Sequence, residues 1–142
     1  MVRAVVFDCD GVLSDNGSSW QNIHKKFGTI SNNGSEHSKM LEKFLDGAIS
    51  EEEFVEFDIR LWRSVKPDIH RDDIMRCYSG VELMEGAREV VAELQSRGVY
   101  VAIVSSGVDV FVGAIASMLK VDDWVANGFE WDDDGFLILK SD

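Results

Sequence analysis

Two aspartates one residue apart, Asp8 and Asp10, follow an apolar run and precede a glycine in the stretch VVFDCDGVLSD. In an extended backbone, alternate side chains project to the same side, so both carboxylates should face one crevice while Cys9 packs behind them. Two carboxyl groups that lie close together have different pKa values. One can then stay ionised as a nucleophile or metal ligand while the other holds a proton. A divalent cation, which prefers oxygen ligands, would relieve their repulsion. The pair therefore predicts acid–base or metal chemistry.

A second polar cluster, Ser105, Ser106 and Gly107, follows the apolar run VYVAIV and precedes a predicted helix. A hydroxyl group and free backbone amides at a helix N-terminus suit an anion. Gly11 leaves the backbone amides after Asp8 uncovered, which suits an anion as well. Carboxylates with a cation, opposite such an anion site, indicate phosphoryl transfer through an aspartyl intermediate.

Short inner strands must position both clusters. Residues 2–8 and 99–107 are nearly continuous apolar runs, which are typical of buried parallel strands, and residues 123–127 form a short third strand candidate. A helix between parallel strands implies a right-handed crossover and an open, Rossmann-like α/β sheet, whose ligands lie beyond the carboxyl ends of the strands. Helical spacing predicts helices at about residues 20–27, 40–45, 54–65, 70–78, 87–94 and 109–120, and a hairpin with Asp134 and Gly135 at its turn ends the chain.

Composition excludes several other classes of function. The chain has 142 residues, 45% of them hydrophobic, and a net charge of −12. Such a surface repels phosphate backbones and anionic lipid, so we expect no nucleic-acid or membrane partner. Cys9 and Cys77 have no metal-ligand spacing, and no apolar run approaches the ~20 residues of a membrane helix. We expect a soluble, cytoplasmic protein.

VVFDCDGVLSD resembles the first motif of the haloacid dehalogenase superfamily, an Asp-x-Asp-Gly-Thr/Val signature that ends the first strand. VAIVSSG resembles its second motif, an apolar strand that ends in Ser or Thr. The segment from LMEGAREVV to VDDWVAN resembles the phosphoserine-phosphatase-like branch, which inserts a small helical-bundle cap after the first motif. The resemblance implies a core domain at residues 1–15 and 80–142 and a cap at residues 16–79.

The resemblance also implies a role for each residue of the two motifs. Asp8 would be the nucleophile and a Mg²⁺ ligand. Asp10 would be the general acid and then the base, with its backbone carbonyl also on Mg²⁺. Ser105 would hold a phosphate oxygen, helped by amides near Gly11 and Ser106. The implied function is Mg²⁺-dependent hydrolysis of a small phosphorylated metabolite.

Two further motifs of the superfamily, a lysine and a Gly-Asp pair with more acidic residues, are not found. Lys140 lies too close to the expected hairpin to be that lysine. The missing strand would lie beside the first one, so we expect an incomplete sheet with residues 2–8 at an exposed edge. The chain would then be a fragment, or a homo-oligomer or strand exchange would cover this edge, and turnover by the chain alone would be inefficient.

The cap offers weaker candidates for substrate contact. Phosphoserine phosphatases carry a cap glutamate where this chain has Gly17, and a cap arginine could be Arg60 or Arg63. Asp58 lies on the apolar stripe of its helix, which favours a structural salt bridge over substrate contact. Trp20 and Trp62 are expected in the core of the cap rather than in a recognition site. The histidines lack ligand spacing and are expected at the surface: His24, His37 and His70.

Two alternatives remain open at this level. FDCDGVLSD alone also fits a phosphoglycolate-type or phosphosugar-type phosphatase or mutase. The missing downstream motifs favour a different class, a catalytically incomplete fragment that serves as a binding or regulatory module.

Overall fold

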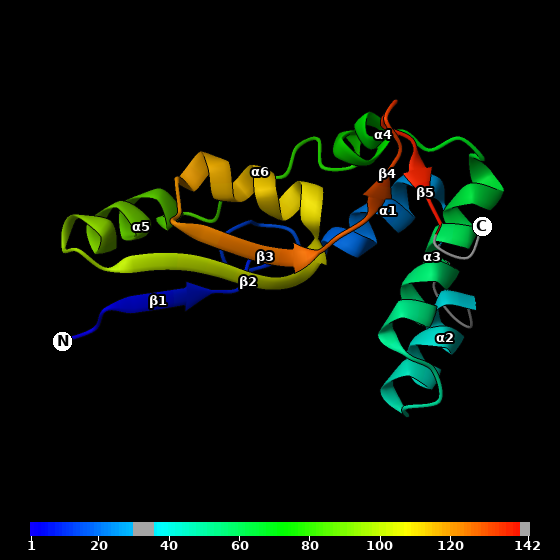
Figure 1. Ribbon diagram of the computed structural model, residues 1–142, viewed down its shortest axis with the longest axis horizontal. Helices are drawn as coiled ribbons and strands as arrows, with labels where there is room; N and C mark the ends of the chain where they lie inside the picture. The colour runs from blue at the N-terminus through cyan, green and yellow to red at the C-terminus, as the bar shows by residue number, and fades with distance from the viewer. Residues whose placement is uncertain (30–35, 140–142) are drawn as a thin grey trace. The chain divides into compact units, whose positions relative to one another are not determined.

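The structure, a computed structural model, describes residues 1–29 and 36–139, with no side-chain description of residues 36 and 37 (Figure 1). None of the described helices is long and apolar enough to cross a membrane. The chain forms two compact units, which we call the sheet unit (Met1–Asn22 with Met75–Phe129) and the helical unit (Ile23–Ile74 with Glu130–Asp142).

Three parallel strands form the centre of the sheet unit in the order β1-β2-β3 (Figure 1). They are β1 (Ala4–Phe7), β2 (Tyr100–Val108) and β3 (Asp123–Asn127). Phe7 pairs with Ile103, and the pairing of β2 with β3 is irregular after Val104. The predicted open, parallel α/β sheet is therefore confirmed, with all three strands at the expected positions.

Helices cover one face of this sheet. The helix α5 (Ala87–Ser96) precedes β2, and α6 (Asp109–Leu119) joins β2 to β3. Both crossovers step in the same direction along the sheet, so right-handed connections place both helices on the same face. The buried strand residues Val101 and Ile103 contribute to the core beneath them, together with Phe111 of α6.

The opposite face of the sheet is apolar and exposed. Val6, Val104 and Val125 come from the three strands and are 61%, 56% and 60% exposed. Within the described residues, β1 pairs with β2 alone, so its outer edge has no strand beside it. This matches the exposed edge expected from the sequence.

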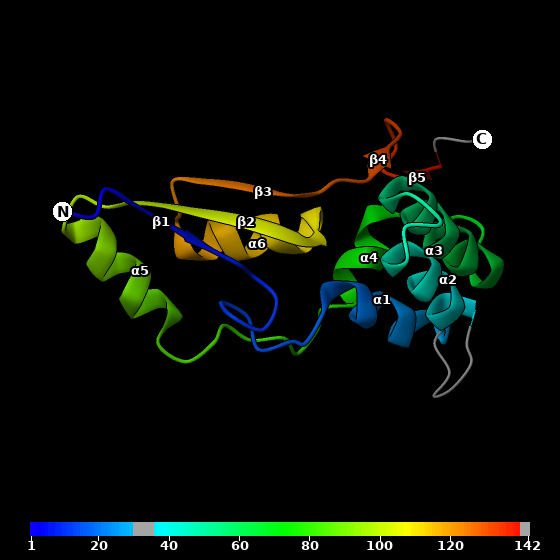
Figure 2. The ribbon, with the colours of Figure 1, turned by 90° about the horizontal axis from the view of Figure 1, so that it is seen from below.

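The helical unit contains α2 (Glu36–Leu45), α3 (Glu51–Val65) and most of α4 (Arg71–Arg76). The helix α1 (Ser19–Phe27) begins in the sheet unit and ends in the helical unit. A capping box starts α3: Ser50 Oγ accepts from the Glu53 amide, and Glu53 Oε1 accepts from the Ser50 amide. The helix α2 lies beside α3, where Phe44 stacks on Phe54 (Figure 2).

The predicted hairpin is present as β4 (Glu130–Trp131) and β5 (Leu137–Ile138), with Gly135 at φ 90° in its turn. Its contacts lie in the helical unit, because the Leu137 amide donates to the Ile69 carbonyl and Arg63 Nη2 donates to the Leu137 carbonyl. The domain boundaries inferred from the sequence, which assigned the hairpin to the core domain, stay a prediction. By its contacts, this hairpin belongs with the helices.

Candidate active site

The two polar clusters lie at the carboxyl ends of neighbouring strands. Asp8 directly follows β1, and the pairing of Phe7 with Ile103 brings Asp8 to the level of Val104, one residue before Ser105. Asp8 is exposed, Cys9 is fully buried and Asp10 is partly buried. The packing of Cys9 behind Asp8 agrees with the alternation expected along DCD, while a common crevice for both carboxylates stays a prediction. The sheet thereby brings the first aspartate next to the serine cluster.

The carboxylate of Asp10 has one satisfied oxygen and one unsatisfied oxygen. Its Oδ2 accepts from both the amide and the hydroxyl of Ser19, at 2.8 and 2.7 Å. Its Oδ1 is shielded from solvent and has no hydrogen-bond partner among the described residues. Buried polar oxygens are rarely left without a partner, so Oδ1 is suited to a ligand, a cation or a proton.

Gly107 lies where these groups converge. A Cβ atom at this position would be 2.7 Å from Ser19 Oγ, 2.9 Å from Asp10 Oδ2 and 3.1 Å from Ser105 Oγ. Three oxygens from three segments therefore surround one backbone position, and only glycine fits between them. Ser105 Oγ accepts from the Gly107 amide at 2.9 Å, which leaves its hydroxyl hydrogen for an anion.

The turn after β1 provides fewer amides for an anion than the sequence suggested. Gly11 has φ 74°, a conformation that glycine adopts without strain. The amides of Val12 and Leu13, however, both donate to the Cys9 carbonyl. Those two amides are therefore used within the turn.

Cys9 itself is excluded as a nucleophile. Burial, with a smaller contribution from the charge of Asp10, raises the pKa of its thiol to about 12. The thiolate is the reactive form of cysteine, so Cys9 stays inert near neutral pH. Its role is packing.

Trp20 also lies at this end of the sheet. Its indole Nε1 donates to the Ser106 carbonyl at 2.9 Å, and Asn127 Nδ2 donates to the same oxygen at 2.7 Å. Its ring meets Phe129 edge-to-face, with centroids 5.5 Å apart. The expectation that Trp20 belongs to the core of the cap is not supported by these contacts, because Ser106 and Phe129 both belong to the sheet unit.

Residues that the sequence did not single out complete the surroundings of Asp10. Ser19 is fully buried, and Tyr78 donates its hydroxyl to the Ser19 carbonyl at 3.1 Å. Burial raises the pKa of Tyr78 above its usual range, so the phenol keeps this proton. The only sequence signal for Ser19 was its place in a Ser-Ser pair at a helix start, which is typical of ordinary capping.

The cap candidate Asp58 belongs to a buried cluster of the helical unit. It is 3% exposed, and its Oδ2 lies 3.3 Å from His24 Nε2. Trp62 Nε1 donates to His24 Nδ1 at 3.1 Å. This geometry favours the structural salt bridge over substrate contact for Asp58. Arg60 is exposed on the same helix.

The expectation of surface histidines is wrong for His24, which is fully buried. Its spacing of four residues from Trp20 places it on the inner face of α1, and this was the available signal. His70 is partly buried, with its Nε2 2.9 Å from the Asp134 carbonyl. The side chain of His37 and all of Lys140 lie outside the described residues.

No group of three or more His, Cys, Asp or Glu side chains in the described part of the chain could hold a metal ion. Asp8 and Asp10 nevertheless supply two carboxylates, and Asp10 Oδ1 is a shielded oxygen without a partner. Mg²⁺ is commonly held by one or two carboxylates together with water and substrate phosphate, so this donor set fits it.

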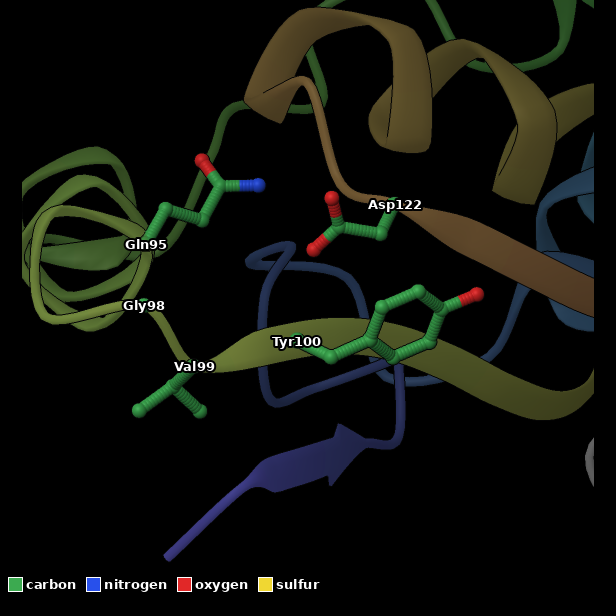
Figure 3. A pocket seen from close by; sticks show the side chains of 5 residues that line it. All are labelled: Gln95, Gly98, Val99, Tyr100 and Asp122. Atoms are coloured by element: carbon green, nitrogen blue, oxygen red, sulfur yellow. The ribbon is translucent and has the colours of Figure 1, made fainter.

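A small cavity of about 280 Å³ lies at the other end of the strands (Figure 3). It is lined by residues at the start of β2 and before β3, and the side chains of Tyr100 and Asp122 face it. Asp122 Oδ2 accepts from the Val101 amide at 2.7 Å. This cavity is not part of the candidate active site.

Comparison with known proteins agrees with this geometry. Residues 5–141 match the haloacid dehalogenase-like hydrolase family. Phosphoserine phosphatases of Archaeoglobus fulgidus and Methanocaldococcus jannaschii are 31% and 27% identical over 90% and 88% of this chain. The chain spans only 35% and 55% of their respective lengths.

A solved phosphoserine phosphatase, described as a phospho-aspartyl intermediate analogue, is also similar. It superposes with a TM-score of 0.70 at 26% identity, covering 96% of this chain and 60% of that one. The resemblance to the phosphoserine-phosphatase-like branch is thereby confirmed in sequence and in fold. The chain belongs to the haloacid dehalogenase-like hydrolase family.

Proposed function

We propose that this chain carries the nucleophile half of a Mg²⁺-dependent phosphomonoester hydrolase. The observation that carries the proposal is the convergence of oxygens from Asp10, Ser19 and Ser105 around Gly107, next to the strand end that bears Asp8. The relatives that match over most of this chain are phosphoserine phosphatases, and one solved relative is an analogue of a phospho-aspartyl intermediate.

The proposed reaction has two displacement steps. A carboxylate oxygen of Asp8 attacks phosphorus, and the bond from phosphorus to the ester oxygen breaks with its electron pair on that oxygen. Asp10 gives its proton to this leaving oxygen. A water oxygen then attacks the aspartyl phosphate, Asp10 takes the water proton, and Asp8 leaves as a carboxylate with inorganic phosphate as product. Ser105 donates a hydrogen bond to a phosphate oxygen throughout.

Asp8 and the backbone carbonyl of Asp10 would hold Mg²⁺. The cation, when bound, neutralises charge on the phosphoryl oxygens and on the attacking carboxylate. The remaining assistance in this site comes from the chain itself, through the Ser105 hydroxyl and the orientation of Asp10 by Ser19.

We further propose a small phosphorylated metabolite as substrate, with phosphoserine as the first compound to test because both curated relatives carry that name. Gly17 stands near the position where phosphoserine phosphatases carry a cap glutamate, which keeps a phosphoglycolate-type or phosphosugar-type substrate as the alternative within the enzyme class. Arg60 is the exposed cation on α3 that remains a candidate for substrate contact. Cys9 and Cys77 are both buried, and neither forms a disulfide, which agrees with a reducing cytosol.

The proposal is tested by phosphate release and by a fluoride adduct on the same protein. The chain is incubated with Mg²⁺ and p-nitrophenyl phosphate, and separately with beryllofluoride, whose adduct on a carboxylate is detected by ¹⁹F NMR. We expect both signals for the wild type, and we expect Asp8→Asn to abolish them because an amide does not attack phosphorus. Asp133→Asn, an exposed turn residue, is the matched control and should keep both.

The two readouts also separate the remaining classes of function. An adduct without turnover supports a nucleophile half that needs further residues for efficient catalysis. Neither adduct nor turnover in the wild type contradicts the hydrolase and favours a binding or regulatory module.

We also propose that a second polypeptide strand pairs with β1, in a homo-oligomer or by strand exchange. Parallel sheets are normally covered on both faces, whereas here one face exposes Val6, Val104 and Val125 beside the open edge of β1. Sedimentation velocity should detect association that Val6→Lys reduces. A strictly monomeric wild type at high concentration would contradict self-association.

A further inference from the structure

The strand β2 loses its regular pairing at the residues of the serine cluster. Val104 pairs with Val125, and the next pair joins Val108 to Asn127, so three residues of β2 face one residue of β3. Bulges of this kind turn groups out of the ladder and are common next to active sites. The backbone groups of residues 105–107 therefore need partners outside the regular pairing with β3.

Two side chains of the sheet unit supply such partners for the Ser106 carbonyl. Trp20 Nε1 donates to this oxygen at 2.9 Å, and Asn127 Nδ2 donates to it at 2.7 Å. A carbonyl oxygen has two lone pairs, so these two donors can occupy both. The two donors come from distant parts of the chain, because Trp20 lies in α1 and Asn127 ends β3.

The same peptide unit is also held at its other side. The Ser106 carbonyl and the Gly107 N–H belong to one planar trans peptide, so they point in opposite directions. The Gly107 amide donates to Ser105 Oγ at 2.9 Å. The peptide between Ser106 and Gly107 is therefore fixed by two donors on one side and by the Ser105 hydroxyl oxygen on the other.

We propose that Trp20 and Asn127 are positioning residues for the phosphate-binding serine. They hold this peptide in the orientation that directs the Gly107 N–H to Ser105 Oγ. Because this oxygen accepts from the amide, its own hydrogen points away from the amide and is presented to a phosphate oxygen. Ser105 is partly exposed, so a phosphate can reach it. The inference rests on the proposed function, in which Ser105 binds the phosphoryl group.

Gly107 is the reason that this peptide needs to be held. A Cβ at position 107 would lie 2.7 Å from Ser19 Oγ and 3.1 Å from Ser105 Oγ, so only glycine fits there. Glycine lacks the Cβ that restricts other residues, and the peptide before it turns more easily. A turned peptide would direct its carbonyl oxygen toward the Ser105 hydroxyl and accept the hydrogen that a phosphate needs. Donors on the carbonyl oppose this rotation.

Packing keeps the indole of Trp20 in place. Its ring meets Phe129 edge-to-face, with centroids 5.5 Å apart. Phe129 is buried, and its amide donates to Asp109 Oδ2 at 3.3 Å at the start of α6. All of these residues belong to the sheet unit, so the arrangement is complete within one compact unit.

The orientation of the peptide is tested by NMR on the isotope-labelled full chain, without any need for turnover. Asn127→Ala and Trp20→Phe each remove one donor, so each should move the carbonyl ¹³C resonance of Ser106 upfield. In the double variant the peptide is free to turn, so the Gly107 amide proton should lose its hydrogen bond and move upfield as well. Trp124→Phe, which removes an exposed indole of β3, is the matched control and should leave both resonances unchanged.

Each result of this experiment decides the role of the two donors. A Ser106 carbonyl resonance that is identical in the wild type and in folded Asn127→Ala would overturn the proposal. An unchanged Gly107 amide proton in the double variant would overturn it equally, because the peptide would then keep its orientation without either donor. If the double variant does not fold, the carbonyl resonance in Asn127→Ala decides alone, since this side chain is partly exposed and its loss leaves the Trp20 ring in place.

A double-mutant cycle with Ser105→Ala shows whether the two donors act through the serine. Binding of inorganic phosphate in the presence of Mg²⁺ is measured from amide shifts. The loss of both donors, or of Asn127 alone if the double variant does not fold, should weaken phosphate binding about two- to tenfold, the effect of one lost hydrogen bond. In the Ser105→Ala background the same change should weaken it no further, because residues that act through one group are not additive.

The cycle separates positioning from a merely structural role. An equal loss in both backgrounds, or no loss in either, would overturn the inference while leaving the proposed function intact. A wild type that binds no phosphate and forms no beryllofluoride adduct would contradict the proposed function and the phosphate role of Ser105. The Ser106 and Gly107 resonances would then still decide whether Trp20 and Asn127 hold the peptide.

Discussion

Two polar clusters, one in each unit, differ in what surrounds their carboxylate. The site cluster, which consists of Asp10, Ser19, Ser105 and Gly107, leaves Asp10 Oδ1 without a hydrogen-bond partner in the described structure. In the helical cluster, which consists of His24, Asp58 and Trp62, the carboxylate lies against the imidazole of His24. There, the indole donates to one ring nitrogen of His24, and the other ring nitrogen faces the Asp58 carboxylate.

The difference favours Asp10 over Asp58 as the carboxylate that takes part in the proposed reaction. Trp62 Nε1 can only donate, so His24 Nδ1 accepts from it, and His24 Nε2 lies 3.3 Å from the Asp58 carboxylate. Asp58 is 3% exposed and lies against this ring, which favours a structural role over contact with a substrate. Asp10 is oriented by comparable hydrogen bonds, but only on one oxygen. A carboxylate that is fixed on one side and free on the other is suited to proton transfer.

The largest effect that would sharpen this comparison comes from matched amide substitutions. Asp58→Asn places an NH₂ group in a buried site and weakens the acceptor for His24, so we expect it to lower the free energy of unfolding by about 1–3 kcal/mol. Asp10→Asn should lower it by less than about 1 kcal/mol, because the amide oxygen can still accept from Ser19 while the NH₂ group replaces an oxygen that had no partner. Urea denaturation of both variants measures the difference.

The comparison fails if the two variants lose equal stability. It also fails in the reverse case, where Asp10→Asn is the more damaging change. Either result would mean that Asp10 contributes to folding as much as Asp58 does, and the free oxygen of Asp10 would no longer mark it as functional.

The fold was predictable from the sequence because periodicity and capping are local signals. The apolar runs at residues 2–8 and 99–107 predicted the two inner strands, and helical spacing predicted most of α3. The pairing of the first two strands followed from the rule for parallel crossovers. The place of the hairpin did not follow, because its attachment depends on Arg63 and Ile69, which are distant in sequence.

The sequence predicted those site residues that combine a reactive side chain with a position at the end of an apolar strand. It did not predict the residues whose contacts are distant in sequence. Asp8 and Asp10 come just after the apolar strand β1, and Ser105 lies near the end of the apolar strand β2, so this pattern can be recognised in the sequence. Ser19 looks like an ordinary helix cap, and its contact with Val108 spans 89 residues. The burial of His24 could not be predicted for the same reason, because its partners Asp58 and Trp62 lie on another helix and are distant in sequence.

A smaller effect tests whether burial alone makes a carboxylate functional. Asp109 begins α6 in the sheet unit, and burial raises the pKa of its carboxyl above the ordinary value of 3.8, although Val110 and Phe129 donate to it. The native state therefore holds this proton more tightly than the unfolded chain does. Protonated Asp109 therefore contributes to the free energy of unfolding. This contribution is fully present below pH 3.8 and is lost as the pH rises through the native pKa.

Asp109→Asn cannot ionise, so its stability lacks this dependence on pH. We expect the wild type to lose stability relative to Asp109→Asn as the pH rises from 3 to 7, by about 1.4 kcal/mol for each unit of pKa displacement. Urea denaturation at several pH values measures this difference, with Asp133→Asn at an exposed turn position as the control variant. A flat difference for Asp109→Asn would show that its two amide donors fully offset burial. The other outcome is a stability difference that changes with pH while Asp109→Asn keeps its aryl phosphatase activity. It would show that burial alone does not make a carboxylate of the sheet unit functional. The oxygen of Asp10 that has no hydrogen-bond partner within the described chain would then be the feature that separates the two aspartates.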